Sequence, residues 1–193
     1  MLREKRRQQT ARDIQLATLL LAVERGLENI TTEEIAASAG VSTRTFFNYY
    51  TNKESAAVGT PPAFGQDDKD ALRAGTGPLA EDLKRFLDRH FERLEEDEPI
   101  LSMVGTILRS NEKAQVILNG FLIAERDALA ECLSHRVKNR PTAAALASTA
   151  AIAIGRTIHL WEHEDDLSLR EALDIVWDGL MEAARLLAAP PTP

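Results

Sequence analysis

The sequence has little of several things that define other protein classes. It has a single cysteine, Cys132, so it cannot form a disulfide within one chain, and we expect a reducing, cytoplasmic setting. Aromatic residues make up only 5%, while alanine is abundant, which favours helices over sheets. No run of 18 consecutive apolar residues and no apolar signal core are present, so we expect neither membrane insertion nor secretion.

Catalytic signatures are also missing from the sequence. It has no G-x-S-x-G, no glycine-rich phosphate loop and no H-E-x-x-H, so we predict that the protein is not an enzyme and holds no resident cofactor. His159 and His163 have a spacing that can hold a metal on one helix face. A histidine near a helix C-terminus is favourable without metal, however, and we predict no metal site there.

Positive charge is lacking overall, since the formal net charge is −7. The charges are distributed unevenly. Residues 1–58 carry 8 Lys or Arg against 7 Asp or Glu, and residues 3–12 alone hold five basic residues and one acid. Attraction to phosphate depends on the local face rather than on the sum. Residues 1–9 are therefore either a basic arm that reaches DNA phosphates or a disordered, solubilising tail.

Residues 31–54 predict two short helices joined by a tight turn, followed by the start of a third. Thr31 and Glu34 have the spacing of a capping box, which satisfies N–H groups at a helix start. Gly40 ends that helix because glycine readily adopts a left-handed backbone, and Ser42 caps the second helix. Thr51 and Glu54 repeat the capping-box spacing. The arrangement is typical of a helix-turn-helix unit.

The second helix of such a unit lies in the major groove, with its first residues toward base edges. Arg44 can contact guanine with two hydrogen bonds, whereas Phe46 and either Phe47 or Tyr50 must turn inward to hold the helix. The alternative is an ordinary surface helix with a polar end. The predicted DNA-binding residues are Thr31, Thr32, Ser42, Thr43, Arg44, Thr45, Asn48, Tyr49 and Lys53.

This segment resembles the DNA-binding motif of the TetR family of transcriptional regulators. The shared residues are Ile35-Ala36, Gly40-Val41-Ser42, the aromatic run 46–50 and Lys53-Glu54. Two positions depart from the family pattern. Tyr49 stands where the family often has histidine, and Arg44 stands where it often has glycine or proline, which implies a distinctive operator. The resemblance is close over about 50 N-terminal residues and otherwise extends only to length and helical character.

The whole chain is predicted to be all-α, with about nine helices. A three-helix DNA-binding head at residues 1–58 precedes a connection at 59–77, rich in glycine, proline and aspartate, that is either a hinge or a plain loop. A C-terminal effector-binding and dimerisation domain is expected at 78–188, and a disordered tail at 189–193. The first helix is predicted at residues 10–25, and later ones at 78–96, 100–109, 112–138, 141–163 and 169–187.

By resemblance, a small-molecule effector site lies among the middle helices, although each candidate residue could equally be plain core. The candidates, which are mostly apolar and suit a hydrophobic ligand, are Phe86, His90, Met103, Ile107, Phe121, Glu125, Leu129 and Trp161.

The last two helices are predicted to form a homodimer interface, as they do in the TetR family. Residues 143–155 are nearly all small or β-branched, and the final helix carries a spaced apolar stripe. Part of this surface must instead be core within the chain. The candidates are Ala147, Ala151, Ile154, Leu173, Val176, Trp177, Leu180 and Ala184.

By its resemblance to the TetR family, the chain is expected to be a cytoplasmic regulator that binds double-stranded DNA at a palindromic operator as a homodimer and responds to an effector. Repression is the usual outcome in that family, although a helix-turn-helix unit does not reveal the sign of regulation. A shift between two states requires that the effector bind them with different affinities. The alternative is a helical small-molecule-binding or scaffold protein without useful sequence-specific DNA binding. The acidic C-terminal part and the Asn48-Tyr49 pair keep that alternative open.

Overall fold

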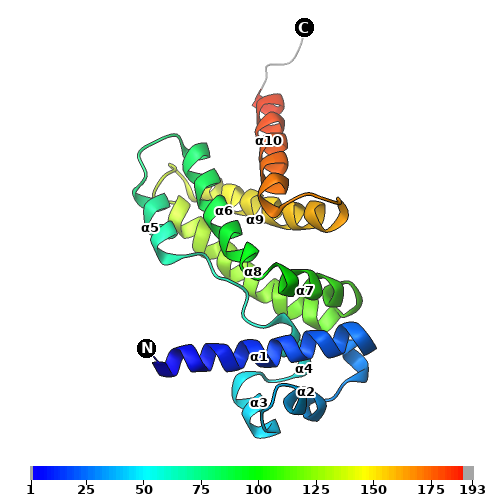
Figure 1. The fold of residues 1–193 in the computed structure, drawn as a ribbon. Coiled ribbons are helices and arrows are strands. Elements are labelled where there is room, and N and C mark those ends of the chain that lie inside the picture. The colour runs from blue at the N-terminus through cyan, green and yellow to red at the C-terminus, as the bar shows by residue number, and fades with distance from the viewer. Residues whose placement is uncertain (1, 189–193) are drawn as a thin grey trace. The chain divides into compact units, whose positions relative to one another are not determined.

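The structure is a computed structural model that describes residues 2–188. Over that range it contains ten α-helices and no strand, so the predicted all-α class is confirmed. The predicted disordered tail, residues 189–193, lies outside the described residues. The helices, shown in Figure 1, are α1 (Leu2–Arg25), α2 (Thr32–Ser38), α3 (Thr43–Tyr49), α4 (Lys53–Val58), α5 (Gln66–Ala74), α6 (Leu79–Glu95), α7 (Glu98–Ser110), α8 (Glu112–Leu133), α9 (Arg140–His163) and α10 (Leu169–Ala188), with a 3-10 turn at Leu27–Asn29.

Two compact units make up the chain. Among the described residues, the first combines residues 2–61 with residues 97–121, and the second combines residues 62–96 with residues 122–188. Helix α7 and the first part of α8 therefore pack with the N-terminal helices, which the sequence did not indicate. The connection expected at 59–77 contains the nine-residue helix α5. Whether the boundaries at 58 and 77 also mark a flexible hinge stays a prediction.

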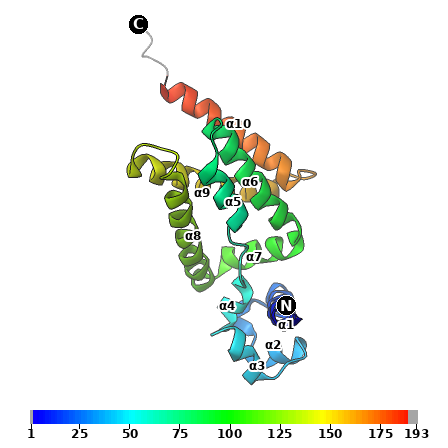
Figure 2. The ribbon, with the colours of Figure 1, turned by 90° about the vertical axis from the view of Figure 1, so that its left-hand side faces the viewer.

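The first unit is built around α1, which contacts α2, α4 and α7. Helices α2 and α3 lie on one side of α1 and α7 lies on the other (Figures 1 and 2). Leucine and isoleucine side chains that recur at helical spacing on α1 face this core. The fully buried large side chains are Ile14, Leu19, Leu27, Ile30, Ile35 and Phe46.

Helix α1 is longer than the sequence predicted. It begins at Leu2 rather than at Thr10, so most of the basic arm belongs to the helix. No proline or glycine interrupts residues 2–25, and lysine, arginine and glutamine are good helix formers. Arg3, Lys5, Arg6 and Arg7 are exposed on its first turns.

The second unit joins α5 to α6 and packs α10 against both α6 and α9. Arg136, just after α8, fixes the chain between α5 and α6: its guanidinium donates to the carbonyl oxygens of Leu72 at 2.8 Å and Gly77 at 2.9 Å. Helix α8 ends at Leu133, five residues before the predicted end, because residues 134–139 form turns.

Helix α9 combines length with apolar composition, so that by these criteria alone it could cross a membrane. Core helices of soluble proteins pass the same test, which makes this weak evidence. Ala143, Ala147, Ala150, Ala153 and Thr157 are buried along one face of α9, and its small side chains allow close packing against α10. The helix thus has a packing role within its unit.

Candidate nucleic-acid interface

The turn between α2 and α3 has the geometry that the sequence predicted. The Thr31 hydroxyl accepts the backbone N–H of Glu34, while the Glu34 carboxylate accepts the backbone N–H of Thr31, completing the capping box. These hydrogen bonds, with the Arg25 guanidinium at 2.8 Å, lower the pKa of Glu34. Gly40 has φ of +68°, and the N–H of Val41 reaches the carbonyl of Ala36 at 2.9 Å. This pair of features is a Schellman helix end.

Helix α3 is held by two buried aromatic residues, Phe46 within the helix and Tyr50 directly after its last residue. Phe46 is completely buried, and Tyr50 is buried with its hydroxyl donating to the carbonyl oxygen of Ala11 on α1 at 3.1 Å. Burial also raises the pKa of Tyr50. The predicted choice between Phe47 and Tyr50 is thus resolved in favour of Tyr50. The contact with α1 fixes which face of α3 points outward.

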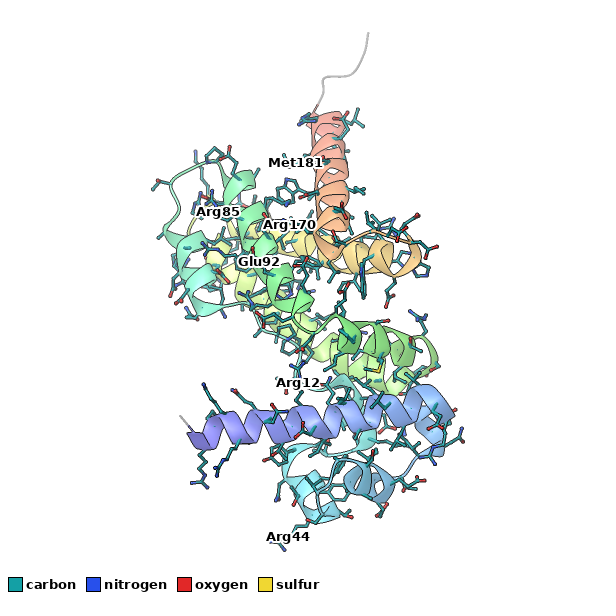
Figure 3. All side chains as sticks on the ribbon, viewed as in Figure 1. Arg12, Arg44, Arg85, Glu92, Arg170 and Met181 are labelled. Carbon is teal, nitrogen blue, oxygen red and sulfur yellow. The ribbon has the colours of Figure 1, made fainter. Side chains whose placement is uncertain are left out.

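The outer face of α3 begins with the predicted polar residues. Ser42 caps the helix by accepting the N–H of Thr45 at 3.0 Å, and the two hydroxyls lie 2.8 Å apart. Arg44 is exposed, and none of the hydrogen bonds or ion pairs found among residues 2–188 uses its guanidinium. Figure 3 shows its side chain projecting away from the unit. An unpaired, projecting guanidinium is suited to a guanine edge or a phosphate.

Phe47 is a residue of this face that the sequence analysis missed. It is 53% exposed and meets the Phe46 ring edge to face, with ring centroids 5.3 Å apart. Exposed phenylalanine can contact the methyl group of thymine. Its position three residues after Arg44 was the signal that could have identified it, because residues three apart share a helix face. Asn48 is exposed and Tyr49 half-buried on the same helix.

Lys53 is positioned differently from the prediction. Its ammonium group donates to two backbone carbonyl oxygens, of Glu28 at 2.9 Å and Ile30 at 3.0 Å. Two of its three donors therefore join α4 to the segment before α2, which leaves one for a phosphate. The cap of α4 also differs: Asn52 and Ser55 form the capping box instead of Thr51 and Glu54.

The other predicted DNA contacts lie at the start of α2 and α3. Thr31 is exposed, while Thr32 and Thr43 are half-buried. The Thr32 hydroxyl donates to the Glu33 carboxylate at 3.2 Å. Both threonines therefore have a carboxylate beside the hydroxyl, since the Thr31 hydroxyl donates to the Glu34 carboxylate at 3.1 Å.

The predicted effector residues divide between the two units. Met103, Ile107 and Phe121 belong to the first unit, and the other five belong to the second. Within the second unit, Phe86, His90 and Leu129 are buried. Glu125 accepts the backbone N–H of Phe64 at 2.7 Å, and Trp161 is half-buried. A small pocket of this unit is lined by Asp68, Leu72, Arg85, Phe86 and Arg89, with two further residues.

Two predicted interface residues are buried within the chain itself. Ala147 and Leu173 are fully inaccessible, so they are core between α9 and α10 rather than surface for a second copy. Ala151, Ile154, Val176, Trp177 and Leu180 are half-buried, and Ala184 is exposed.

Comparison with known proteins connects this geometry with a protein family. Residues 15–55 match the model of a family described as bacterial regulatory proteins, tetR family. No curated protein matches the sequence at a significant level. The matched segment covers the C-terminal part of α1, all of α2 and α3, and the capped start of α4, which is the part that carries the geometry above.

Solved structures share the fold over nearly the whole chain. A TetR-family regulator of Syntrophomonas wolfei has a TM-score of 0.62 and 16% identity, with 91% of this chain and 95% of that chain covered. A fatty acid metabolism regulator of Clostridium perfringens has a TM-score of 0.60 and 17% identity, covering 88% and 97%. FadR of Thermus thermophilus, a TetR-family repressor in complex with lauroyl-CoA, has a TM-score of 0.56 and 22% identity, covering 95% and 98%. At these identities the likeness concerns the fold.

Proposed function

We propose that this chain, which has the DNA-binding domain and the fold of a TetR-family transcriptional regulator, is a cytoplasmic, ligand-responsive repressor that binds a palindromic operator as a homodimer. The observation that carries the proposal is the outer face of α3. Arg44 is exposed and unpaired among the described residues, while Phe46 and Tyr50 lock the opposite face into the core. A rigid helix with a free guanidinium is what major-groove reading requires.

The apolar surface of α10 supports the proposal that two copies of the chain form a dimer. Its apolar stripe begins at Leu173, which is fully buried, and continues through half-buried Trp177 and Leu180 to Leu187, which is 89% exposed. Within one chain, other helices cover only the first turns of this stripe. Figures 1 and 2 show the last turns of α10 extending beyond α6 and α9. An isologous contact between two such helices would cover the remainder and pair two reading helices.

The effector is proposed to be a small molecule bound in the C-terminal domain. FadR of Thermus thermophilus is in complex with lauroyl-CoA, and the Clostridium protein is described as a regulator of fatty acid metabolism. Fatty acyl compounds are therefore the first ligands to test. Relief of repression needs an effector that favours the state unable to bind the operator.

Selection of bound sequences from random duplex DNA at near-physiological salt tests the proposal. A dimeric repressor should recover a palindrome whose half-sites lie about one DNA turn apart, or a little more. Genomic matches to that palindrome then identify the controlled genes, and a reporter downstream distinguishes repression from activation. Recovery of unrelated sequences, with the chain folded and dimeric, would favour the alternative of a helical binding or scaffold protein.

A further inference from the structure

An unusual polar cluster lies in the second unit where α5 meets α6. Asp68 on α5 is largely buried and accepts from two arginines of α6: Arg89 reaches one carboxylate oxygen at 2.8 Å and Arg93 reaches the other at 2.7 Å. The two ion pairs outweigh the effect of burial and lower the pKa of Asp68. Two guanidinium groups thus share one carboxylate, and the cluster carries a net charge of +1.

The cluster is packed tightly against the backbone. A Cβ atom at Gly65 would lie 2.6 Å from the Asp68 carboxylate and 3.2 Å from the Arg93 guanidinium. Contacts below 3.0 Å require that something shift. A larger residue at position 65 would push against the ends of the Asp68 and Arg93 side chains, so Gly65 leaves room for this ion pair.

Arg93 uses only one side of its guanidinium in this cluster. Nη1 donates to Asp68, whereas Nε and Nη2 are both buried and have no hydrogen-bond partner among the described residues. Burying such donors without an acceptor is unfavourable, because the hydrogen bonds that they make to water are lost. The Nε and Nη2 hydrogens form a planar fork that matches two oxygens of one carboxylate or phosphate group.

His90 adds a third unpaired group three residues earlier on α6. It is only 7% exposed, and its Nδ1 has no partner within residues 2–188. Residues three apart on a helix share a face, so His90 and Arg93 present their unpaired nitrogens on neighbouring parts of α6. Burial, together with the positive charge of Arg93, lowers the pKa of His90 to about 4, so the ring is neutral at physiological pH.

Aromatic side chains border these donors. The Phe64 ring lies 4.8 Å from the His90 ring and 4.8 Å from the Phe86 ring, centroid to centroid. Phe64, Phe86 and Phe91 are all buried. The region therefore combines a few fixed polar groups with an apolar surround, as small-molecule sites do. The nearby Glu125 carboxylate is already engaged by the backbone N–H of Phe64.

We infer that the Nε–Nη2 edge of Arg93, with His90 Nδ1, binds an oxyanion of the effector, and that the effector joins this oxyanion to an apolar group packed near Phe64 and Phe86. The inference rests on the proposed function, since it names the chemistry of the effector. A carboxylate and a phosphate monoester both supply the required oxygens.

The test measures binding to the full chain by titration calorimetry with three probes that share one tail: decanoate, decyl phosphate and 1-decanol. Wild-type protein should bind the better of the two anions at least tenfold more tightly than the alcohol. The stronger anion then tells which oxyanion the site takes. If neither anion binds better than 1-decanol, the inference is wrong.

Arg93→Lys is the decisive variant. Lysine retains a positive charge for Asp68 but has no planar edge, so anion affinity should fall at least tenfold while the alcohol is unaffected. Arg185→Lys is the matched control, because Arg185 lies on α10 of the same unit, is exposed and pairs with Glu182 at 2.9 Å. Equal anion affinities in wild-type protein and the Arg93→Lys variant would overturn the assignment.

His90 is tested by a pair of substitutions. His90→Asn keeps a donor close to the place of Nδ1, whereas His90→Leu removes it, so anion affinity should be retained better in the His90→Asn variant. Thermal melting of each free variant separates lost folding from lost binding. Operator binding is measured without any probe, so a protein that binds its palindrome but shows no anion preference refutes this inference and leaves the proposed function standing.

Discussion

The ammonium group of Lys53 donates to the backbone carbonyl oxygen of Ile30 at 3.0 Å. This bond, with the companion bond to Glu28, ties the start of α4 to the chain that enters α2. Lys53 therefore stabilises the helix-turn-helix unit in the absence of DNA. Its substitution should affect folding as well as binding, and the two effects can be measured apart.

Lys53→Met should lower the free energy of unfolding by about 1–2 kcal/mol, because two hydrogen bonds from a charged donor are lost. The slope of log affinity against log salt concentration should change by less than the loss of one phosphate contact would cause, because two of the three donors of Lys53 are already used. Urea unfolding and salt-dependent binding measure these effects. Lys113→Met, an exposed lysine of the same unit, is the control. Unchanged stability with a full unit of slope lost would restore Lys53 as a phosphate contact.

Arg44→Ala should leave the melting temperature unchanged, because the side chain is exposed and has no partner in the described part of the chain. Operator affinity should fall by about 1–3 kcal/mol, and base preference at one position of each half-site should relax. Repeating the sequence selection with the variant measures both. An unaltered selected sequence would exclude Arg44 as a base reader.

Phe47→Ala should weaken operator binding roughly threefold to tenfold by removing an apolar contact with thymine. The effect on stability should be small, because the ring is 53% exposed. Phe46→Ala provides the contrast. That ring is fully buried, and its loss should cost about 3–5 kcal/mol of stability. Competition binding and thermal melting distinguish the two. Equal destabilisation by both substitutions would mean that Phe47 supports the core.

His90 should make the protein less stable in acid. Its pKa is about 4 in the folded chain and near 6.5 when unfolded, so between these values the unfolded chain binds more protons. Stability is therefore complete above pH 6.5 and falls as the pH drops toward 4, by about 2 kcal/mol between pH 7 and 5. His90→Leu should remove this part of the pH dependence in urea unfolding. An identical slope in both proteins would show that other groups cause it.

Leu187→Asp should weaken the dimer at least tenfold without altering the fold of one chain, because Leu187 is 89% exposed. A charge placed in a shared apolar contact must be desolvated when the copies meet. Sedimentation equilibrium measures the dissociation constant. Arg185→Asp, on the opposite side of α10, is the control with the larger change in charge. A monomeric wild-type protein, or equal effects of both variants, would contradict the proposed contact.

Local signals account for the parts of the fold that the sequence predicted well. The cap at Thr31, the left-handed Gly40 and the cap at Ser42 each depend on residues within a few positions, so their spacing is visible in the sequence. The Ser168 cap of α10, which Glu171 completes, depends on residues that are equally close in the sequence.

Contacts between distant residues could not be predicted in this way. Lys53 and Ile30 are 23 positions apart, and Asp68 and Arg93 are 25 apart. No local pattern reveals that the ammonium group of Lys53, which was expected to contact a DNA phosphate, donates hydrogen bonds to backbone carbonyl oxygens. Similarly, the apolar stripe of α10 predicted a contact face but did not show where the chain's own core ends along that stripe. Leu173 was therefore assigned to the dimer interface, although it is fully buried within the chain.

The half-covered stripe on α10 has a consequence for gene dosage. If operator binding requires two chains joined along this stripe, the occupied fraction of operator rises with the square of the chain concentration while most chains are single. At low operator occupancy, halving the chain concentration would then reduce the occupied fraction to about one quarter. A less stable contact along the stripe would raise the chain concentration at which the operator is half occupied, without any change in the DNA sequence that is recognised.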